Sequence, residues 1–193
     1  MTSIIKVDTI QSAAGSTVLE QTNATTITLG STGQTILLNA NATNNFAVNT
    51  PSFFAYLSSN QSLTDNVESK AEIDTEIFDT GGCYDNITNY RFTPNVTGKY
   101  FIFAAGALDA SASNFSDGAI SIFKNGNRLY QAINNQSNNN ANQISIPISI
   151  IDDANGTTDY YEIYVVCDDS SGNPALNSAN RRTYFGAYRI IGA

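Results

Sequence analysis

Hydrophobic and polar residues alternate in short runs along most of the chain, and helical periodicity is nearly absent. These runs are rich in β-branched and aromatic residues and are cut by Gly, Asn, Asp and Ser, which is typical of strands separated by turns. Beyond residue 50 the pattern predicts strands at Ser52–Leu57, Glu72–Phe78, Arg91–Thr93, Lys99–Asp109, Ala119–Lys124, Arg128–Ile133, Gln143–Ile151, Asp159–Cys167 and Arg182–Ile191. Regularly spaced strands without helices predict an all-β sandwich or jelly roll.

Two local signals refine this prediction. Asn125-Gly126 lies between two alternating runs, and it predicts a tight hairpin because a type I′ turn needs positive φ at both central residues. Pro147 interrupts an apolar run. Proline cannot donate a hydrogen bond to a neighbouring strand, so that strand is expected at a sheet edge or at a bulge.

Residues 1–50 differ from the remainder of the chain. They are rich in Thr, Ser, Asn, Ala and Gln, and Phe46 is their single aromatic residue. The short runs that alternate here carry too little apolar material for a core of their own, and an isolated hairpin is marginal in water. We therefore predict a β-rich stem or attachment segment at 1–50 that orders through association, followed by a separate head at 51–193. A low-complexity linker is the alternative for residues 1–50.

Composition excludes several functional classes. Of the 193 residues, 9 are basic and 17 are acidic, which gives a net charge of −8. A duplex nucleic-acid partner is not expected because nothing supplies a basic face. The chain has no histidine, so catalytic sites and zinc sites that depend on an imidazole are ruled out. No apolar stretch is long enough for a membrane helix, and membrane insertion is not expected.

The cysteines and the N-terminal residues indicate the redox state of the protein and the cellular compartment in which it is made. Cys167 ends an alternating strand pattern, and we interpret it as a buried free thiol, with a Cys83–Cys167 disulfide as the alternative. The sequence starts without a basic segment followed by a long apolar run. We therefore expect synthesis in a cytoplasm without a cleaved leader.

Several short motifs occur in a characteristic order within 51–193. They are Phe54-Ala55, Phe92-Thr93-Pro94, Gly98 with Tyr100 and Phe103, Lys124-Asn125-Gly126, Asp159–Ile163, and Tyr184–Tyr188. Taken together, these segments resemble the globular head of complement component 1q, which belongs with the tumour-necrosis-factor-like jelly rolls. The departures from that pattern are Pro94, which comes one position early, Thr158, which replaces a glycine, and Phe185 and Gly186, which are adjacent.

The resemblance implies a homotrimer around a three-fold axis. A sandwich with aromatic residues on both faces of its strands also needs a partner to bury the second face, and a closed ring of copies supplies one. Candidate trimer-interface residues are Tyr100, Ile102, Tyr161, Tyr164, Tyr184 and Tyr188. For any single one of these, a place in the ordinary core is the alternative.

The N-terminal run Ile4–Gln11, followed by Gly15 and Val18, resembles the opening segments of bacteriophage tail and fibre proteins. This resemblance implies that residues 1–50 attach the head to other virion proteins. It also implies a virion as the final location.

Acidic residues supply two candidate sites. Asp168, Asp169 and Asn173 lie in one turn and form a candidate calcium site, since calcium prefers carboxylate and carbonyl oxygens on a flexible loop. A solvated turn is the alternative, and no other cofactor is expected. Glu72, Asp74 and Glu76 would share one face of a strand. Paired carboxylates are what a glycosidase uses, and an exposed acidic face is the competing interpretation.

The sequence therefore favours a non-enzymatic virion structural protein: a trimeric fibre, tail or head-decoration protein. A polar tract could offer amide groups to a host-surface glycan or protein, and its candidate residues are Asn134, Asn135, Gln136, Asn138, Asn139 and Asn140. Exposed loops often carry recognition, although a passive solvated loop is the alternative. The competing functions are a lectin-like module outside any virion and, more remotely, a carboxylate-based glycosidase.

Overall fold

The computed structural model of the protein describes residues 49–110, 115–136, 141–170 and 172–191. Apart from Asn49 and Thr50, the predicted N-terminal segment 1–50 lies outside the described residues. Asn138, Asn139 and Asn140 of the predicted receptor loop also lie outside them.

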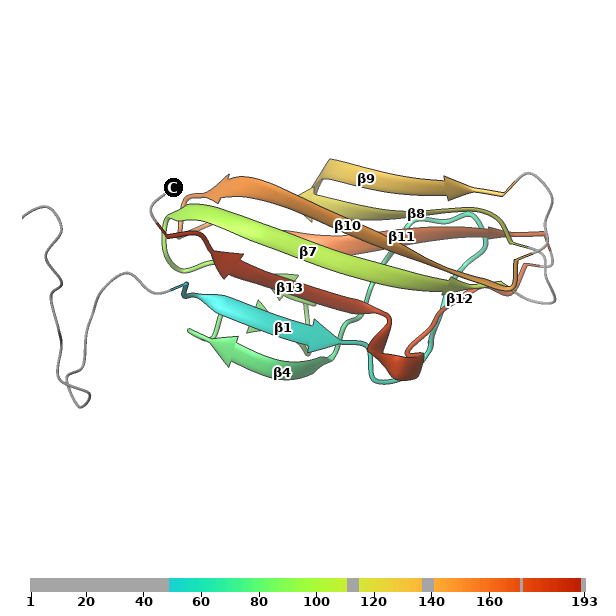
Figure 1. Ribbon diagram of the computed structural model, residues 1–193, viewed down its shortest axis with the longest axis horizontal. Coiled ribbons are helices and arrows are strands. Elements are labelled where there is room, and N and C mark those ends of the chain that lie inside the picture. Colours follow the sequence, from blue (N-terminus) through green and yellow to red (C-terminus); the bar gives the residue numbers. More distant parts are fainter. Residues whose placement is uncertain (1–48, 111–114, 137–140, 171, 192–193) are drawn as a thin grey trace, which may run out of the picture. The chain divides into compact units, whose positions relative to one another are not determined.

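Sheet A is antiparallel and is built around the long strand β7. Across it, β10, β7, β13, β1 and β4 lie side by side in that order (Figure 1), and β12 and β2 continue the sheet beyond the end of β13. The strands are β1 (Ser52–Tyr56), β2 (Gln61–Ser62), β4 (Thr75–Thr80), β7 (Gly98–Asp109), β10 (Gln143–Ala154), β12 (Ala175–Leu176) and β13 (Tyr184–Arg189).

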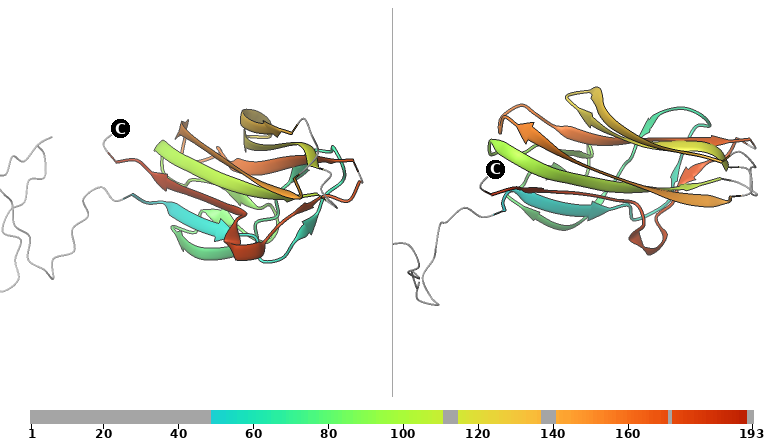
Figure 2. Two further views of the ribbon diagram at one scale, coloured as in Figure 1. Left: turned by 45° about the vertical axis from the view of Figure 1, so that its right-hand side comes forward. Right: turned by 45° about the horizontal axis from the view of Figure 1, so that its top comes forward.

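Sheet B faces sheet A as a second layer (Figure 2). Its order is β5, β6, β11, β8 and β9, and β3 pairs with β11 beside β6. The strands are β3 (Ser69–Lys70), β5 (Tyr84–Asp85), β6 (Arg91–Phe92), β8 (Phe115–Lys124), β9 (Asn127–Asn135) and β11 (Tyr161–Asp169). Within the described residues the only helical element is a short 3₁₀ turn, η2 (Ala179–Arg181), so the predicted all-β jelly roll is confirmed.

Both local signals in the sequence are confirmed. Asn125 and Gly126 have φ of 53° and 77° and connect β8 to β9, which agrees with a type I′ hairpin. Pro147 lies in β10, which pairs with β7 and forms one edge of sheet A. The absent N–H of the proline therefore costs the sheet no hydrogen bond.

The strand predictions need correction at one boundary and at four short strands, of which β5 and β12 also lie outside the predicted ranges. The predicted strand Glu72–Phe78 begins later, because β4 starts at Thr75, so Glu72 and Asp74 precede the strand. The segment 58–70 appears polar in sequence, but it contains the short strands β2 and β3. Two-residue strands leave too little alternation to be found in the sequence.

An aromatic cluster fills one end of the space between the sheets. Phe53 of β1 stacks on Tyr84 at 4.4 Å and on Phe92 at 4.9 Å, and Phe185 of β13 meets Phe53 edge-on at 4.9 Å. All four side chains are buried. These rings join both sheets, since Phe53 and Phe185 come from sheet A, and Tyr84 and Phe92 come from sheet B.

The buried tyrosines of this core keep their hydroxyl groups hydrogen-bonded. Tyr84 donates to the Ile73 carbonyl at 2.7 Å, and Tyr100 donates to the Val96 carbonyl at 2.6 Å. Tyr161 donates to Asp152 at 2.7 Å. Since a buried hydroxyl group without a partner is costly, these bonds allow the large rings to lie inside the sandwich.

Replacing Phe92 by alanine should lower the free energy of unfolding by about 3–5 kcal/mol, the usual cost of removing a large buried ring. Chemical denaturation at a fixed protein concentration measures the change. Ile87→Ala is the matched control, because Ile87 is 78% exposed and its truncation should cost less than about 0.5 kcal/mol. Equal effects of the two variants would contradict the assigned core.

Candidate functional site

The outward side of sheet A carries a continuous aromatic surface, which we call the aromatic face. Along β7, Phe101 and Phe103 alternate with the buried Tyr100 and Ile102 and therefore point away from the core. The aromatic face consists of Phe54, Phe78, Phe101, Phe103, Tyr184 and Tyr188. Within the sheet, Phe101 contacts Phe103 and Tyr188 at ring distances of 5.6 Å and 5.5 Å.

Cross-strand register places these rings in rows. One row runs from Phe78 through Phe54 and Gly186 to Phe103. A Cβ atom on Gly186 would lie 2.5 Å from Phe103 and 3.0 Å from Phe54. The glycine therefore provides the space in which the two rings approach each other, with their centroids 6.1 Å apart.

The aromatic face also contains a shallow groove. It has a volume of about 360 Å³ and is lined by Phe101, Phe103, Ala104, Pro147, Ile148, Ser149 and Tyr184. Tyr188 and Phe78 are 39% and 48% exposed, respectively. Apolar side chains that gather on an exposed surface are typical of contact sites for other molecules.

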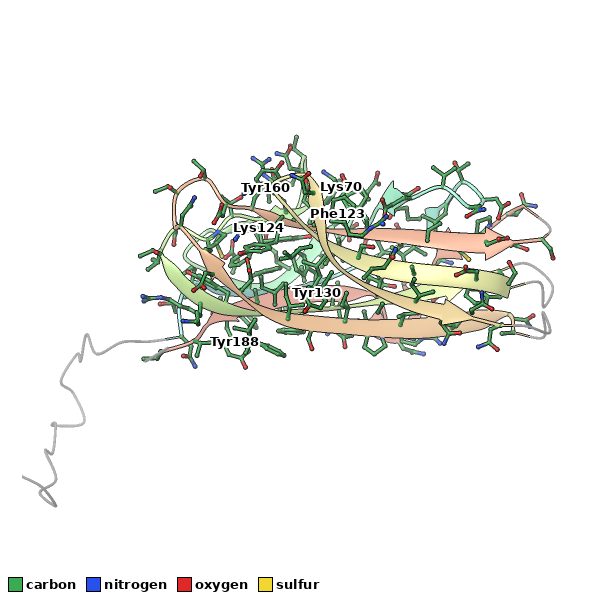
Figure 3. All side chains as sticks on the ribbon, turned by 90° about the horizontal axis from the view of Figure 1, so that it is seen from above. Lys70, Phe123, Lys124, Tyr130, Tyr160 and Tyr188 are labelled. Atoms are coloured by element: carbon green, nitrogen blue, oxygen red, sulfur yellow. The ribbon has the colours of Figure 1, made fainter. Side chains whose placement is uncertain are left out.

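Exposed apolar side chains also lie along strand β9, at the edge of the sandwich, and they occur on both of its faces: Tyr130 lies opposite Ile122, and Ile133 lies opposite Ala119. Tyr130 and Ile133 are 60% and 63% exposed, and Leu129 is also exposed. We call these three residues the β9 edge. Figure 3 looks onto this side of the head, with Tyr130 between Tyr188 on one flank and Phe123, Lys70 and Tyr160 on the other. The β9 edge and the aromatic face are therefore different parts of the same chain.

The outward side of sheet B differs because its rings are covered by charged groups of the same chain. Arg91 lies 4.7 Å from the ring of Tyr160, and Lys70 lies 5.8 Å from the ring of Tyr164. Lys70 also forms a 2.6 Å ion pair with the buried Glu162. Over the six rings of the aromatic face, in contrast, no cation of the described residues is placed.

The predicted trimer-interface residues divide into three groups. Tyr100, Ile102 and Tyr161 are fully buried between the sheets, and this placement removes them as interface residues. Tyr164 lies on the outward side of sheet B, where its ring is 4.3 Å from Phe123. Tyr184 and Tyr188 belong to the aromatic face.

Four residues of the aromatic face were not among the sequence candidates: Phe54, Phe78, Phe101 and Phe103. The three residues of the β9 edge were also missed. The sequence did contain a signal for Phe101 and Phe103. Residues 100–103 are apolar in succession, so the side chains on both faces of that strand are apolar. The sequence candidates on that strand came from the other row.

The acidic turn after β11 is largely occupied by contacts within the chain. The Asp169 N–H donates to Asp65 at 2.7 Å, and Ser116 donates to the Asp168 carbonyl at 3.1 Å. Asp169 is buried. The described residues contain no group of three or more carboxylate, thiol or imidazole side chains that could hold a metal ion. The calcium candidate Asp168, Asp169 and Asn173 therefore gains no support from the geometry.

The described part of the predicted receptor loop lies at the end of β9. Asn134 and Asn135 are the last residues of this strand. Gln136 donates through its side chain to Asn134 at 2.7 Å and through its N–H to the Ser116 carbonyl at 2.9 Å. Of these residues, Gln136 is fixed to the head through its backbone, and its side chain holds that of Asn134.

Of the three candidate catalytic carboxylates, Asp74 is held in contacts that do not fit an acid–base pair. Both oxygens of Asp74 accept hydrogen bonds from Ser58, at 2.8 and 2.6 Å. Burial of Asp74 acts to raise its pKa, but the bonds from Ser58 and Thr75 outweigh it and leave the pKa below the ordinary value. A general acid needs the opposite shift.

The two cysteines are buried free thiols, as the preferred interpretation of the sequence predicted. Burial, followed by the charges of Asp169 and Asp65, raises the pKa of Cys167 to about 12. Burial also raises the pKa of the Cys83 thiol. Neither group is a ready nucleophile, since the thiolate is the reactive form.

Comparison with solved structures identifies the fold. Murine APRIL at pH 5.0 matches with a TM-score of 0.54 and 9% identity, over 72% of this chain and 98% of that chain. The Eiger TNF from S. frugiperda gives 0.53 and 8%, over 74% and 93%. The globular domain of zebrafish complement 1qA gives 0.52 and 11%, over 73% and 97%. The head thus has the jelly-roll fold shared by tumour-necrosis-factor proteins and complement 1q heads.

The sequence comparisons found no relatives. No protein-family model matches the chain, and no curated protein matches it. In the part of the chain that the structure describes, no helix is long and apolar enough to cross a membrane.

Replacing Gly186 by alanine should push the rings of Phe103 and Phe54 apart and lower the free energy of unfolding by about 1–2 kcal/mol. Denaturation at a fixed protein concentration measures this change. Ser149→Ala is the control, because Ser149 is an exposed residue opposite Phe103 on the neighbouring strand. A Gly186→Ala variant as stable as this control would contradict the close packing of the aromatic face.

Proposed function

We propose that the protein is a non-enzymatic binding module whose heads form a homotrimer, with the aromatic face of each copy covered by the β9 edge of the next. The observation that carries the proposal is the presence of two exposed apolar surfaces at different places on one head. Neither surface is covered by other described residues, and both would be unfavourable in water.

The positions of the two surfaces favour a ring. When one patch of a chain binds a different patch of an identical chain, the same contact repeats from copy to copy. The assembly closes into a ring when the rotations between successive copies add up to a full turn. The TNF and complement 1q fold of the head supports three copies as the number, through the trimers that the sequence resemblance implies. The ion-paired part of the outer side of sheet B, around Arg91 and Lys70, would remain exposed to solvent in such a ring.

We further propose that this trimer is a virion component: a fibre, tail or head-decoration protein. Its support comes from the sequence, where residues 4–18 resemble the opening segments of phage tail and fibre proteins. In this proposal residues 1–50 bind other virion proteins, and the amide-rich loop after β9 contacts a host-surface glycan or protein. Three equivalent weak sites on one head would then gain avidity from their high effective concentration.

The trimer is tested with charges placed on each surface separately. The full-length protein should have a mass of about three times 20.7 kDa by light scattering at micromolar concentration. Tyr188→Glu and Ile133→Glu should each give folded monomers, because a charge at the centre of an apolar interface has no partner there. Ile87→Glu, at an exposed position outside both surfaces, should remain trimeric. A monomeric parent protein, or variants that all stay trimeric, would refute the arrangement.

The virion assignment is tested separately. Mass spectrometry of purified particles from the producing cells should detect this chain in a fixed ratio to the capsid and tail proteins. Deleting the segment that corresponds to residues 1–50 should remove the chain from particles while the head still forms trimers. Absence of the full-length chain from purified particles would contradict a virion role and leave the trimer intact.

A further inference from the structure

A polar pocket lies apart from both apolar surfaces. It is formed where the chain leaves β1 and where it enters β4, with one wall from the turn before β6, and its volume is about 360 Å³. Its principal lining residues are Ser59, Asn60, Gln61, Glu72, Asp74 and Tyr90. The volume lies at the lower end of the roughly 300–1,000 Å³ found for small-molecule sites.

Hydrogen bonds between distant parts of the chain hold the walls of this pocket. Gln61 donates from its side chain to the Lys70 carbonyl at 2.8 Å and accepts from the Glu72 N–H at 2.9 Å. The Asn60 side-chain oxygen accepts from Ser178 N–H at 2.9 Å and from the Ser178 hydroxyl at 3.0 Å. The pocket is therefore preformed, which lowers the entropic cost of binding.

Tyr90 forms part of the pocket wall and has an unusual backbone conformation. Its φ is 50°, in the left-handed region that is uncommon for bulky residues. The preceding turn is fixed by Asp85, which accepts bonds from the Thr88 N–H at 2.9 Å and from the Asn89 side chain at 2.6 Å. A backbone held in this way at a pocket wall agrees with a role in ligand contact.

The groups left available in the pocket define the ligand. Among the described residues the Glu72 carboxylate has no hydrogen-bond or ion-pair partner, and it can accept from two adjacent hydroxyls. Asn60 retains its amide N–H groups as donors, and Tyr90 offers a ring and a hydroxyl. A carboxylate, an amide and an aromatic ring around a polar hollow match the alternating hydroxyls and the apolar ring face of a sugar.

Other ligands fit less well. Two carboxylates repel anions, which disfavours acidic sugars and phosphates. A divalent cation would have to compete for Asp74 oxygens that already accept bonds from Ser58. The polar lining gives little attraction to an apolar ligand.

We infer that this pocket binds a neutral monosaccharide unit, with Glu72 accepting hydrogen bonds from its hydroxyls and Tyr90 packing against its ring. This inference goes beyond the proposed trimer and does not depend on it, since every lining residue belongs to a single copy. It also places a sugar site away from the amide-rich loop after β9.

The experiment titrates the full-length protein with methyl glycosides of glucose, mannose and galactose and with N-acetylglucosamine, followed by ligand-observed NMR. At least one probe should bind. Glu72→Gln should weaken its binding about tenfold or more, because the amide replaces the charge-assisted hydrogen bonds of the carboxylate with weaker neutral ones. Tyr90→Asn should abolish binding, and asparagine tolerates the left-handed backbone, so folding should persist.

The control is Glu76→Gln, which removes a nearby carboxylate from β4 that does not line the pocket. It should bind the sugar within about twofold of the parent protein. Melting temperature and light scattering of each variant separate loss of the site from loss of the fold or trimer. The inference is overturned if no probe binds, if Glu72→Gln and Tyr90→Asn bind normally, or if N-acetylneuraminic acid or calcium chloride binds in place of the neutral sugars.

Discussion

The packing of aromatic rings between the two sheets is the interaction on which the rest of this head depends. Phe53 and Phe185 from sheet A meet Tyr84 and Phe92 from sheet B with ring distances of 4.4 to 5.8 Å. Once Phe53 and Phe185 point inward, their neighbours Phe54, Tyr184 and Gly186 must point outward, because successive side chains of a strand alternate between faces. The aromatic face is therefore a direct geometric consequence of how the core is packed.

The aromatic face connects the fold of the head with the proposed assembly of several copies. The outer side of sheet B covers its rings with Arg91 and Lys70. On the outer side of sheet A, Arg181 covers the ring of Tyr56, but no cation of the described residues lies over the six rings of the aromatic face. A chain of net charge −8 has ample polar residues for a solvated surface, so an apolar face of this size is best explained by a partner. In the proposed ring, a copy of the same chain would supply that partner with its β9 edge.

The sequence predicted the strands and the hairpin well, because alternation and the Asn125-Gly126 turn are local signals. It did not decide the orientation of Tyr100 and Ile102, for which it left both the trimer interface and the core open, because both rows of side chains on β7 are apolar. Which of the two rows is buried is decided by the packing of sheet A against sheet B, which the sequence of one strand does not specify. The polar pocket was also out of reach, since it unites Asn60, Glu72 and Tyr90 through contacts with residues as distant as Ser178.

The packing of the aromatic face against the β9 edge is the central claim, and site-directed cross-linking tests it most directly. The native thiols Cys83 and Cys167 are buried, so new cysteines can be introduced at Tyr188 and Ile133 and joined with a short bis-maleimide. The account predicts covalent trimers for the double variant Tyr188→Cys with Ile133→Cys, and no covalent trimers for either single variant. Failure of the double variant to form covalent links between copies would contradict the account.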